Sequence, residues 1–296
     1  PSLAKYLNRF RPKVLLSLMA HANAAAVLAS ILSRRSTKVY VCERTSLSAV
    51  LAYSRSYTHS VYQWLLRQLY RLSTKIVANS KGVKRDLVRI GILPKNKIEV
   101  IWNGIDYQKL REKSLDSLLQ DDLDIFNGPP VIVAVGRLVV EKNYPTLLQV
   151  FSRLIKTCES HLLIIGHGPE SKRIRALITQ LKLEEKVTIL ESVVNPYPYM
   201  RLAKVLAHTS TREGFPNVLL EAMACGTKVI AFDCRWGPSE ILDNGKWGYL
   251  IDQDDEDSFL RGLYRAISAD DESDPTERAQ QFDIKLAADK FQKLLH

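Results

Sequence analysis

The chain has 296 residues, of which 46% are hydrophobic, which is enough for two ordinary domains that each bury a core. Four cysteines stand in apolar or helical contexts without Cys-x-x-Cys spacing, which argues against a disulfide framework and favours reduced thiols in the cytoplasm. The net charge of +10 is uneven. Residues 1–107 hold 18 Lys and Arg against 4 Asp and Glu, and the remainder is close to neutral. The basic first part predicts an anionic partner.

Residues 1–107 alternate short apolar strands with helices, which is typical of a parallel sheet. We expect strands at 13–18, 38–42, 75–78 and 98–101, and helices at 24–33, 61–73 and 82–90. The stretch 14–33 lacks charged residues, but His21 and Asn23 interrupt it, so we expect a strand and a helix and no membrane span. Because the chain starts with Pro1 and four strands are few for such a domain, we expect that strand–helix units are missing from its front.

Residues 108–128 change character, with four aspartates among leucines followed by Asn-Gly-Pro-Pro, and predict a linker. A second alternation occupies residues 129–296. Strands are expected at 131–135, 162–165, 187–190, 204–207, 229–232 and 249–251. Helices are expected near 144–157, 170–181, 197–202 and 217–225, with another starting within 252–257 and a last one at 285–295. The chain therefore predicts two α/β domains.

The segment 210–226, Ser-Thr-Arg-Glu-Gly-Phe-Pro-Asn-Val-Leu-Leu-Glu-Ala-Met-Ala-Cys-Gly, combines a loop with a complete short helix. Pro216 suits the first turn of a helix and Gly226 suits its left-handed end. The free N–H groups of the first turn favour an anion, and the carboxylates of Glu213 and Glu221 can accept hydroxyl hydrogen bonds. The pattern fits a ligand that is part phosphate and part sugar. The spacing alone leaves open a surface loop with solvated glutamates.

This segment closely resembles the signature of the family 4 retaining glycosyltransferases, and the resemblance covers roughly residues 14–251. It implies the GT-B fold, an α/β architecture of two Rossmann-like parallel-sheet domains that face a cleft, here with a truncated N-terminal domain. It further implies a domain at 1–107, a nucleotide-sugar domain at 129–296, and a terminal helix that packs back on the first domain.

Two cations follow the strand at 131–135. Gly136 ends that strand, and Arg137 and Lys142 come directly after it. Ligands of open parallel sheets lie at the carboxyl ends of strands, so these cations suit a diphosphate. The resemblance implies that Arg137 and Lys142 hold the nucleotide diphosphate and stabilise its charge as it leaves. Without the resemblance, two solvated surface cations remain an alternative.

The remaining site residues follow from the same resemblance. Glu213 would contact the hydroxyls of the donor sugar and Glu221 those of the ribose, and these two glutamates have the chemistry for it because carboxylates are acceptors. Backbone or shape contributions to donor binding are expected from seven residues along the motifs: Gly166, the loop positions Val193 and Val194 beside the base, and Gly214-Phe215-Pro216-Asn217.

His21 follows the first strand, and the family often has a histidine there beside the donor sugar, so it is a candidate catalytic residue. A lone histidine before a helix is also compatible with a purely structural role. Residues 61–75 combine Trp64, Leu65, Leu69 and Tyr70 with Arg67, Arg71 and Lys75. This composition fits a helix at an anionic membrane surface, and a packed helix with a solvated basic face is the alternative.

The Asp121-Asp122 and Asp254-Asp255 pairs are interpreted as solvated acids, and no zinc-like Cys/His spacing occurs, so no metal or other cofactor is expected. The sequence thus predicts a glycosyltransferase that moves a hexose or N-acetylhexosamine, UDP-linked, to a glycan or polyprenyl-diphosphate-linked acceptor in polysaccharide biosynthesis. It would act in the cytoplasm, peripheral to the inner face of the membrane. A GT-B nucleotide-sugar epimerase or phosphorylase, a non-catalytic nucleotide-sugar-binding module and, on charge alone, a nucleic-acid binder remain alternatives.

Overall fold

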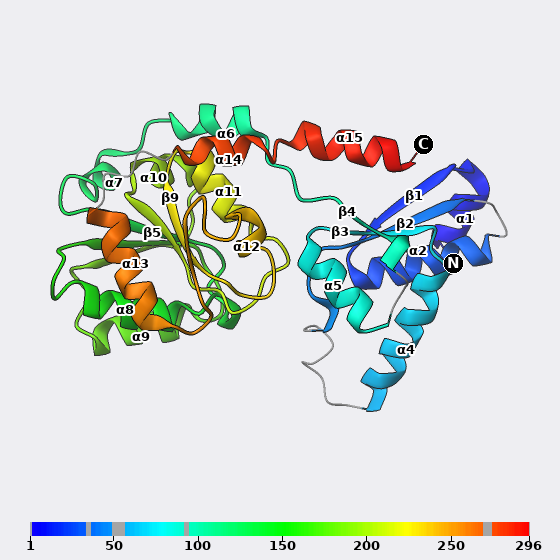
Figure 1. Ribbon diagram of the computed structural model, residues 1–296, viewed down its shortest axis with the longest axis horizontal. Helices are drawn as coiled ribbons and strands as arrows, with labels where there is room; N and C mark the ends of the chain where they lie inside the picture. Colours follow the sequence, from blue (N-terminus) through cyan, green and yellow to red (C-terminus); the bar gives the residue numbers. More distant parts are fainter. Residues whose placement is uncertain (1, 34–36, 49–56, 92–94, 269–273, 296) are drawn as a thin grey trace. The chain divides into compact units, whose positions relative to one another are not determined.

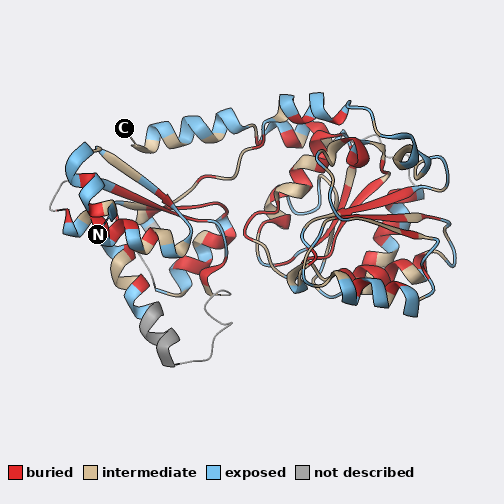
Figure 2. Cartoon of the chain, turned by 180° about the vertical axis from the view of Figure 1, so that it is seen from behind, coloured by how far each residue is buried: buried red, intermediate tan, exposed pale blue. Residues whose placement is uncertain are grey.

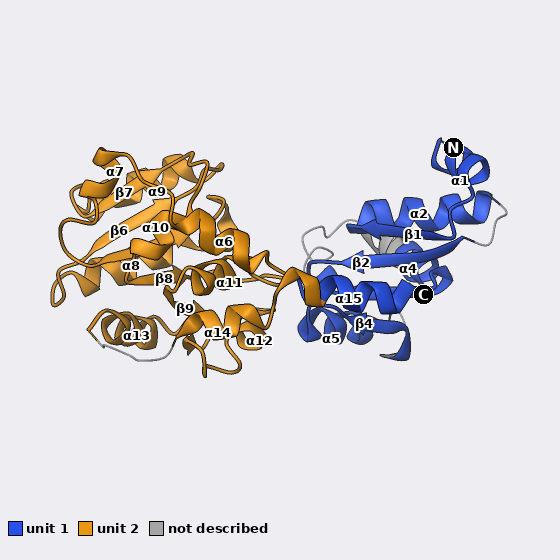
Figure 3. Ribbon diagram, turned by 90° about the horizontal axis from the view of Figure 1, so that it is seen from above, with its two compact units in different colours: residues 1–103, 287–296 blue, residues 104–286 orange. Residues whose placement is uncertain are grey.

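The computed structural model describes residues 2–33, 37–48, 57–91, 95–268 and 274–295. The chain divides into two compact units, which Figure 3 colours separately. Unit 1 comprises residues 1–103 together with 287–296, and unit 2 comprises residues 104–286. Both units are built on parallel sheets, so the prediction of two α/β domains is confirmed.

Unit 1 contains a four-stranded parallel sheet in the order β1-β2-β3-β4. Its strands are β1 (Val14–Leu18), β2 (Lys38–Glu43), β3 (Lys75–Ala78) and β4 (Ile98–Val100). Its helices are α1 (Ser2–Phe10), α2 (Ala20–Leu32), α4 (Tyr57–Leu72) and α5 (Lys81–Arg89), with a 3₁₀ turn, η1, at Lys95–Lys97. Every predicted strand of this unit is present, with ends within one residue of the expected ones.

Strand β2 shows how the sheet of unit 1 is covered on both faces. Successive side chains of a strand point to opposite faces. Glu43 accepts hydrogen bonds from Asn23 of α2 and Tyr70 of α4, which places these helices on one face. Cys42 packs instead with residues of α15 (Ile284–Leu295), and the Tyr40 hydroxyl donates to the carbonyl of Leu294 at 3.1 Å. The last helix of the chain therefore covers the opposite face of this sheet.

Unit 2 contains a six-stranded parallel sheet in the order β10-β9-β8-β5-β6-β7. Its strands are β5 (Val131–Val135), β6 (His161–Ile165), β7 (Val187–Leu190), β8 (Val205–His208), β9 (Lys228–Phe232) and β10 (Tyr249–Ile251). Its helices are α6 (Tyr107–Ser114), α7 (Gln120–Asp124), α8 (Tyr144–Leu154), α9 (Ser171–Gln180), α10 (Tyr197–Leu202), α11 (Asn217–Ala224), α12 (Pro238–Ile241), α13 (Glu256–Ser268) and α14 (Pro275–Gln280). A 3₁₀ turn, η2 (Val140–Lys142), follows β5.

Helices cover both faces of this second sheet, with α8, α9 and α13 on one side and α6, α10, α11 and α14 on the other (Figure 1). The four central strands β5, β6, β8 and β9 are almost wholly buried, as Figure 2 shows, which explains why they occur in the sequence as continuous apolar runs. The strand order reverses between β5 and β8. In open α/β sheets, ligands bind beyond the carboxyl ends of the strands at such a reversal.

Residues 108–128 differ from the expected linker. They contain the end of α6 and all of α7, and α6 packs on α10 and α11 within unit 2. Three of the four aspartates that suggested a linker belong to a helix, since Asp121 and Asp122 lie in the first turn of α7 and Asp124 ends it. Among the described residues, no helix has both the length and the apolar character needed to cross a membrane.

Candidate functional site

The centre of the candidate site lies where the strand order of unit 2 reverses. Lys142 ends the η2 turn after β5, and Glu213 lies in the loop after β8. The Lys142 Nζ donates to Glu213 Oε1 at 2.7 Å, with both side chains only about one-fifth exposed. His208, the last residue of β8 and 4% exposed, places its Nε2 3.4 Å from the same oxygen. Two residues, Lys142 after β5 and His208 at the end of β8, therefore converge on one carboxylate oxygen of Glu213.

Hydrogen bonds between the two loops hold this convergence in place. The Thr209 hydroxyl donates to the carbonyls of Lys142 and Asn143, at 3.0 and 3.2 Å. The backbone N–H of Thr211 donates to the carbonyl of Glu141 at 2.9 Å. Glu213 itself is fixed by backbone bonds to the loop after β9, since its N–H donates to Arg235 and its carbonyl accepts from Trp236. The loop that carries the Glu213 carboxylate is thus hydrogen-bonded to the turn after β5 and to the loop after β9.

The electrostatics of the cluster favour an ionised Glu213. Burial opposes the charge, but His208 and Lys142 outweigh it and lower the pKa of Glu213 to about 2. Burial lowers the pKa of His208, Glu213 raises it and Lys142 lowers it, with a net decrease. His208 is therefore neutral at pH 7, and Lys142 is the cation that balances Glu213.

Glu221 lies one turn into α11, after Phe215 and Pro216, whose side chains are buried. Burial raises the pKa of Glu221, and the charge of Lys142 opposes that rise. Lys142 thus influences both glutamates of the predicted motif. Phe215 packs on Phe282 of the same unit with ring centroids 5.7 Å apart, so the Phe215 side chain supports the loop.

The glycine turns after β5 and β6 are in close backbone contact. A Cβ on Gly166, whose φ is +153°, would lie 1.9 Å from the carbonyl oxygen of Gly136. That same oxygen accepts a hydrogen bond from the Tyr144 hydroxyl at 3.0 Å. Glycine at 166 is therefore required by packing between the two strand ends as well as by its conformation.

The other candidate residues do not take part in the Lys142–Glu213 contact. Arg137 is exposed, and its charge helps to lower the pKa of Glu141. Glu141 is itself paired with Arg212 at 2.5 Å. His21 is an exposed residue in the first turn of α2, in unit 1. Asn217 opens α11 and Gly214 is buried in the loop before it. Within unit 2 the contacts of the structure therefore bring together Lys142 and Glu213, but not Arg137 with them.

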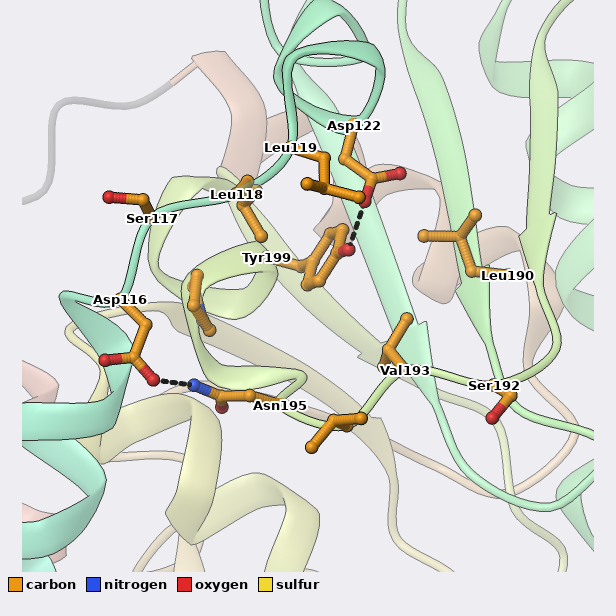
Figure 4. A pocket seen from close by; sticks show the side chains of 12 residues that line it. Asp116, Ser117, Leu118, Leu119, Asp122, Leu190, Ser192, Val193, Asn195 and Tyr199 are labelled. Atoms are coloured by element: carbon orange, nitrogen blue, oxygen red, sulfur yellow. Dashed lines mark hydrogen bonds between the residues drawn. The ribbon is translucent and has the colours of Figure 1, made fainter.

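Val193 and Val194 line a pocket of about 460 Å³ between the 116–122 segment and the loop after β7 (Figure 4). Val194 is fully exposed and Val193 is half-buried. Two hydrogen bonds connect the walls, from the Tyr199 hydroxyl to Asp122 at 2.6 Å and from Asn195 Nδ2 to Asp116 at 2.8 Å. Asp122 is thus a structural acceptor and only partly solvated. The pocket gives the predicted base-binding loop a defined shape.

His208, Tyr144 and Glu141 were not among the site residues predicted from the sequence. A polar residue directly after the apolar run 204–207 was the available signal for His208, because it had to stand at the carboxyl end of a parallel strand. Among the residues that the structure describes, no group of three or more His, Cys, Asp or Glu side chains is arranged to hold a metal ion. Asp255, one of the noted acids, accepts from the N–H and hydroxyl of Ser258 in the first turn of α13.

Comparison with protein families gives two matches that together span most of the chain. Residues 117–282 match the model of "Glycosyl transferases group 1", and residues 1–109 match "Glycosyltransferase Family 4". The chain belongs to the family 4, group 1 glycosyltransferases. The resemblance inferred from the 210–226 segment is thereby confirmed, and the protein is a glycosyltransferase.

Two curated relatives illustrate the range of the family. The Campylobacter jejuni N-acetylgalactosamine-N,N'-diacetylbacillosaminyl-diphospho-undecaprenol 4-alpha-N-acetylgalactosaminyltransferase is 33% identical over 92% of this chain and 73% of the relative's length. The amylovoran biosynthesis glycosyltransferase AmsD of Erwinia amylovora is 30% identical over 90% of this chain and 71% of its own. Among solved structures, Anabaena Alr3699/HepE in complex with UDP superposes with a TM-score of 0.84 at 20% identity, covering 99% of this chain and 80% of the other. This likeness establishes the GT-B fold of the glycosyltransferase.

Proposed function

We propose that this glycosyltransferase moves a hexose or N-acetylhexosamine from a UDP-linked donor to a glycan or polyprenyl-diphosphate-linked acceptor in polysaccharide biosynthesis, with retention of the anomeric configuration. The observation that carries the proposal is the Lys142–Glu213 pair at the strand reversal of unit 2. It places a cation for a leaving diphosphate next to a carboxylate that can accept hydrogen bonds from sugar hydroxyls.

Cleavage of a sugar–diphosphate bond builds negative charge on the leaving group. In the proposed reaction Arg137, Lys142 and the N-terminus of α11 stabilise that charge, each charge-assisted hydrogen bond contributing about 1.5–3 kcal/mol. These positive groups suffice for the leaving group, so we expect no metal requirement. Glu213 orients the donor sugar and Glu221 accepts from the ribose. The departing phosphate oxygen takes the proton of the acceptor hydroxyl on the same face of the sugar, which yields retention.

The names of the relatives support the acceptor class. One relative is named for a diphospho-undecaprenol-linked acceptor, and another is named as a glycosyltransferase of amylovoran biosynthesis. The structure of Anabaena Alr3699/HepE holds UDP, which supports a UDP-linked donor. Uracil recognition is proposed for the loop of Val193 and Val194, through backbone contacts. The role of His21 beside the donor sugar stays a prediction.

The test combines binding and transfer. UDP, UDP-sugars and GDP-sugars are titrated by calorimetry, and the anomer of the product is determined by NMR. We expect UDP compounds to bind and GDP-sugars to bind at least tenfold more weakly. The double variant Arg137→Ala/Lys142→Ala should lose transfer about 10²–10³-fold in kcat, whereas Lys172→Ala, an exposed cation on α9, should not.

Outcomes that contradict the proposal are specific. Unchanged transfer in the double variant would show that the site assignment is wrong. Epimerisation of the donor without an acceptor would identify an epimerase, and UDP binding without transfer to any lipid-linked glycan would identify a binding module. Glu221→Ala should weaken UDP binding about tenfold, because a charge-assisted bond to the ribose is lost.

We also propose a contact between α4 and an anionic membrane surface. Trp64, Leu65 and Leu72 of α4 are exposed together with Arg71, whereas Tyr70, which was expected on the same surface, is fully buried. Amphipathic aromatic and basic side chains are typical of membrane-interface helices. Co-sedimentation with vesicles containing anionic lipid should fall in Trp64→Ala and should not occur with neutral vesicles. Equal sedimentation with both vesicle types would contradict this contact.

A further inference from the structure

His208 is a buried, polar group at the site that the proposed reaction does not use. It ends β8 and is 4% exposed. Its Nε2 makes no hydrogen bond of normal geometry with any residue that the structure describes. The nearest acceptor is Glu213 Oε1, at 3.4 Å. A buried polar atom without a partner destabilises a fold, so such an atom beside a functional carboxylate requires an explanation.

Lys142 has two anionic partners, Glu213 and the diphosphate of the donor, and it cannot bind both equally well. In this structure its Nζ is bound to Glu213 Oε1 at 2.7 Å. In the proposed reaction the same Nζ holds the diphosphate of the donor. When Lys142 turns toward the diphosphate, Glu213 loses its cation while it remains largely buried. A buried carboxylate without a partner has a raised pKa and takes up a proton, and a neutral Glu213 is a poorer acceptor for sugar hydroxyls.

We propose that His208 is a positioning residue that donates its Nε2–H to Glu213 Oε1 when Lys142 engages the donor diphosphate. The inference rests on the proposed function, because it requires Lys142 to bind the diphosphate. The two atoms already lie 3.4 Å apart, and a rotation of the ring with a movement of about half an ångström brings them to a normal hydrogen-bond distance and angle. The N–H of a neutral imidazole satisfies Glu213 without adding a second cation to the site.

The surroundings of His208 support a neutral donor. Its charged neighbours are Glu213 and Lys142, and burial together with Lys142 keeps its pKa below the usual value. Tyr144 and Cys234 also face Glu213, and burial raises the pKa of both, so neither carries charge near pH 7. Both recorded contacts of the carboxylate use Oε1. Oε2 accepts no hydrogen bond from the described residues and is the oxygen for the sugar.

The experiment compares His208→Leu, which removes the donor at similar volume, with His208→Gln, which keeps an N–H donor. The carboxyl carbon of Glu213 is followed by NMR as a function of pH, with and without saturating UDP, and Glu213→Gln identifies the signal. Without UDP, both variants should show Glu213 ionised as in the wild type. With UDP, only His208→Leu should show its pKa raised, by at least one unit, and the acid limb of the kcat profile should move with it.

Kinetics give a second measurement. We expect His208→Leu to lower kcat about tenfold with the Kd for UDP within twofold, and His208→Gln to retain kcat within threefold. A merely structural role would reduce UDP binding and the melting temperature of both variants together. Identical Glu213 titrations of wild type and His208→Leu in the UDP complex would overturn the inference alone.

A nucleotide-free comparison separates this inference from the proposed function. In a Lys142→Met background the cation is absent without any ligand, so Glu213 should depend on His208. The pKa of Glu213 should then be at least one unit higher in Lys142→Met/His208→Leu than in Lys142→Met. Absence of this difference would overturn the role of His208. Absence of UDP binding to the wild type, with this difference present, would overturn the proposed donor and leave the His208–Glu213 contact standing.

Discussion

Each unit contains a buried glutamate near the carboxyl end of a parallel strand, and the two differ in charge. Glu43 ends β2 of unit 1 and is 2% exposed, and its partners are the neutral side chains of Asn23 and Tyr70. Burial raises the pKa of Glu43 to about 7, although both hydrogen bonds act against the rise. Glu213 of unit 2 is paired with Lys142, and its pKa falls to about 2.

The comparison shows that burial alone does not decide the charge of a carboxyl group. Both groups lose hydration, but only Glu213 has a cation within contact distance. Neutral donors reduce the rise for Glu43 without reversing it. The neutral network in unit 1 joins α2, α4 and β2, and one of its atoms, the Oδ1 of Asn23, is buried without a hydrogen bond from the described residues. Unit 1 thus uses its glutamate to connect elements, and unit 2 presents an ionised one.

The largest expected effect comes from removing the charge of each glutamate in turn. Glu213→Gln should lower kcat about 10²–10³-fold, because an acceptor-only carboxylate becomes an amide and Lys142 loses its partner. Glu43→Gln should leave kcat within threefold, because Glu43 belongs to unit 1 and takes no part in the proposed reaction, and its raised pKa leaves it about half protonated near pH 7. Steady-state transfer assays on both variants measure the difference. Equal losses in the two variants would show that the comparison of charge is wrong.

The two units also differ in how much of their structure could be predicted from the sequence. The strands of unit 2, the motif glutamates and Lys142 follow from apolar runs and from residues that stand next to strand ends, because parallel strands bring those ends to one edge. His208 was missed because a single histidine carries no spacing pattern. The pairing of Lys142 with Glu213 could not be predicted either, since it depends on the strand order, which reverses between β5 and β8.

In unit 1 the Glu43 network lay beyond sequence reasoning. Asn23, Glu43 and Tyr70 are far apart in the chain and belong to three different elements, so no local motif connects them. Tyr70 was predicted on an exposed basic face, but it is fully buried because its position on α4 faces the sheet. The predicted linker at 108–128 failed for a related reason. Three of its acids lie within α7, a role that composition does not distinguish from solvation.

The next effect concerns the stability of unit 1 as a function of pH. The pKa of Glu43 is about 7 in the folded state against an ordinary value of 4.5, so the folded state binds the extra proton. Its contribution to the free energy of unfolding is therefore full below pH 4.5 and is lost as pH rises through about 7, a total of about 3 kcal/mol. Denaturant unfolding between pH 5 and pH 9 should show this loss in the wild type and a flatter profile in Glu43→Gln.

For Glu213 we expect the opposite dependence of stability on pH, which serves as an internal reference. Its folded pKa of about 2 lies below 4.5, so its contribution is present above pH 4.5 and is lost as pH falls toward 2. Glu213→Gln should therefore lower stability above pH 4.5 by a constant amount and remove the pH dependence between about 4.5 and 2, with the slope between pH 5 and pH 9 unchanged. Parallel profiles of wild type and Glu43→Gln between pH 5 and pH 9 would contradict a neutral Glu43.

The smallest expected effect tests how much a neutral donor contributes. The Tyr70 hydroxyl donates to Glu43 Oε1, and this bond favours the ionised carboxyl. Tyr70→Phe keeps the buried ring and removes the donor, so the pKa of Glu43 should rise further, by up to about one unit. The pH at which unit 1 loses stability should move upward by the same amount, as measured by denaturant unfolding.

Tyr144→Phe in unit 2 is the matched control. The Tyr144 hydroxyl donates to the carbonyl of Gly136 and to no carboxylate, so its removal should leave the titration of Glu213 unchanged. Hydrogen bonds thus adjust the pKa of Glu43 by a fraction of what burial imposes, whereas His208 and Lys142 together reverse the direction for Glu213. A contradicting result would be a change in the pKa of Glu43 in Tyr70→Phe as large as the change caused by burial. The hydroxyl would then affect the pKa as strongly as a cation does. The difference between the two glutamates would in that case need a cause other than Lys142.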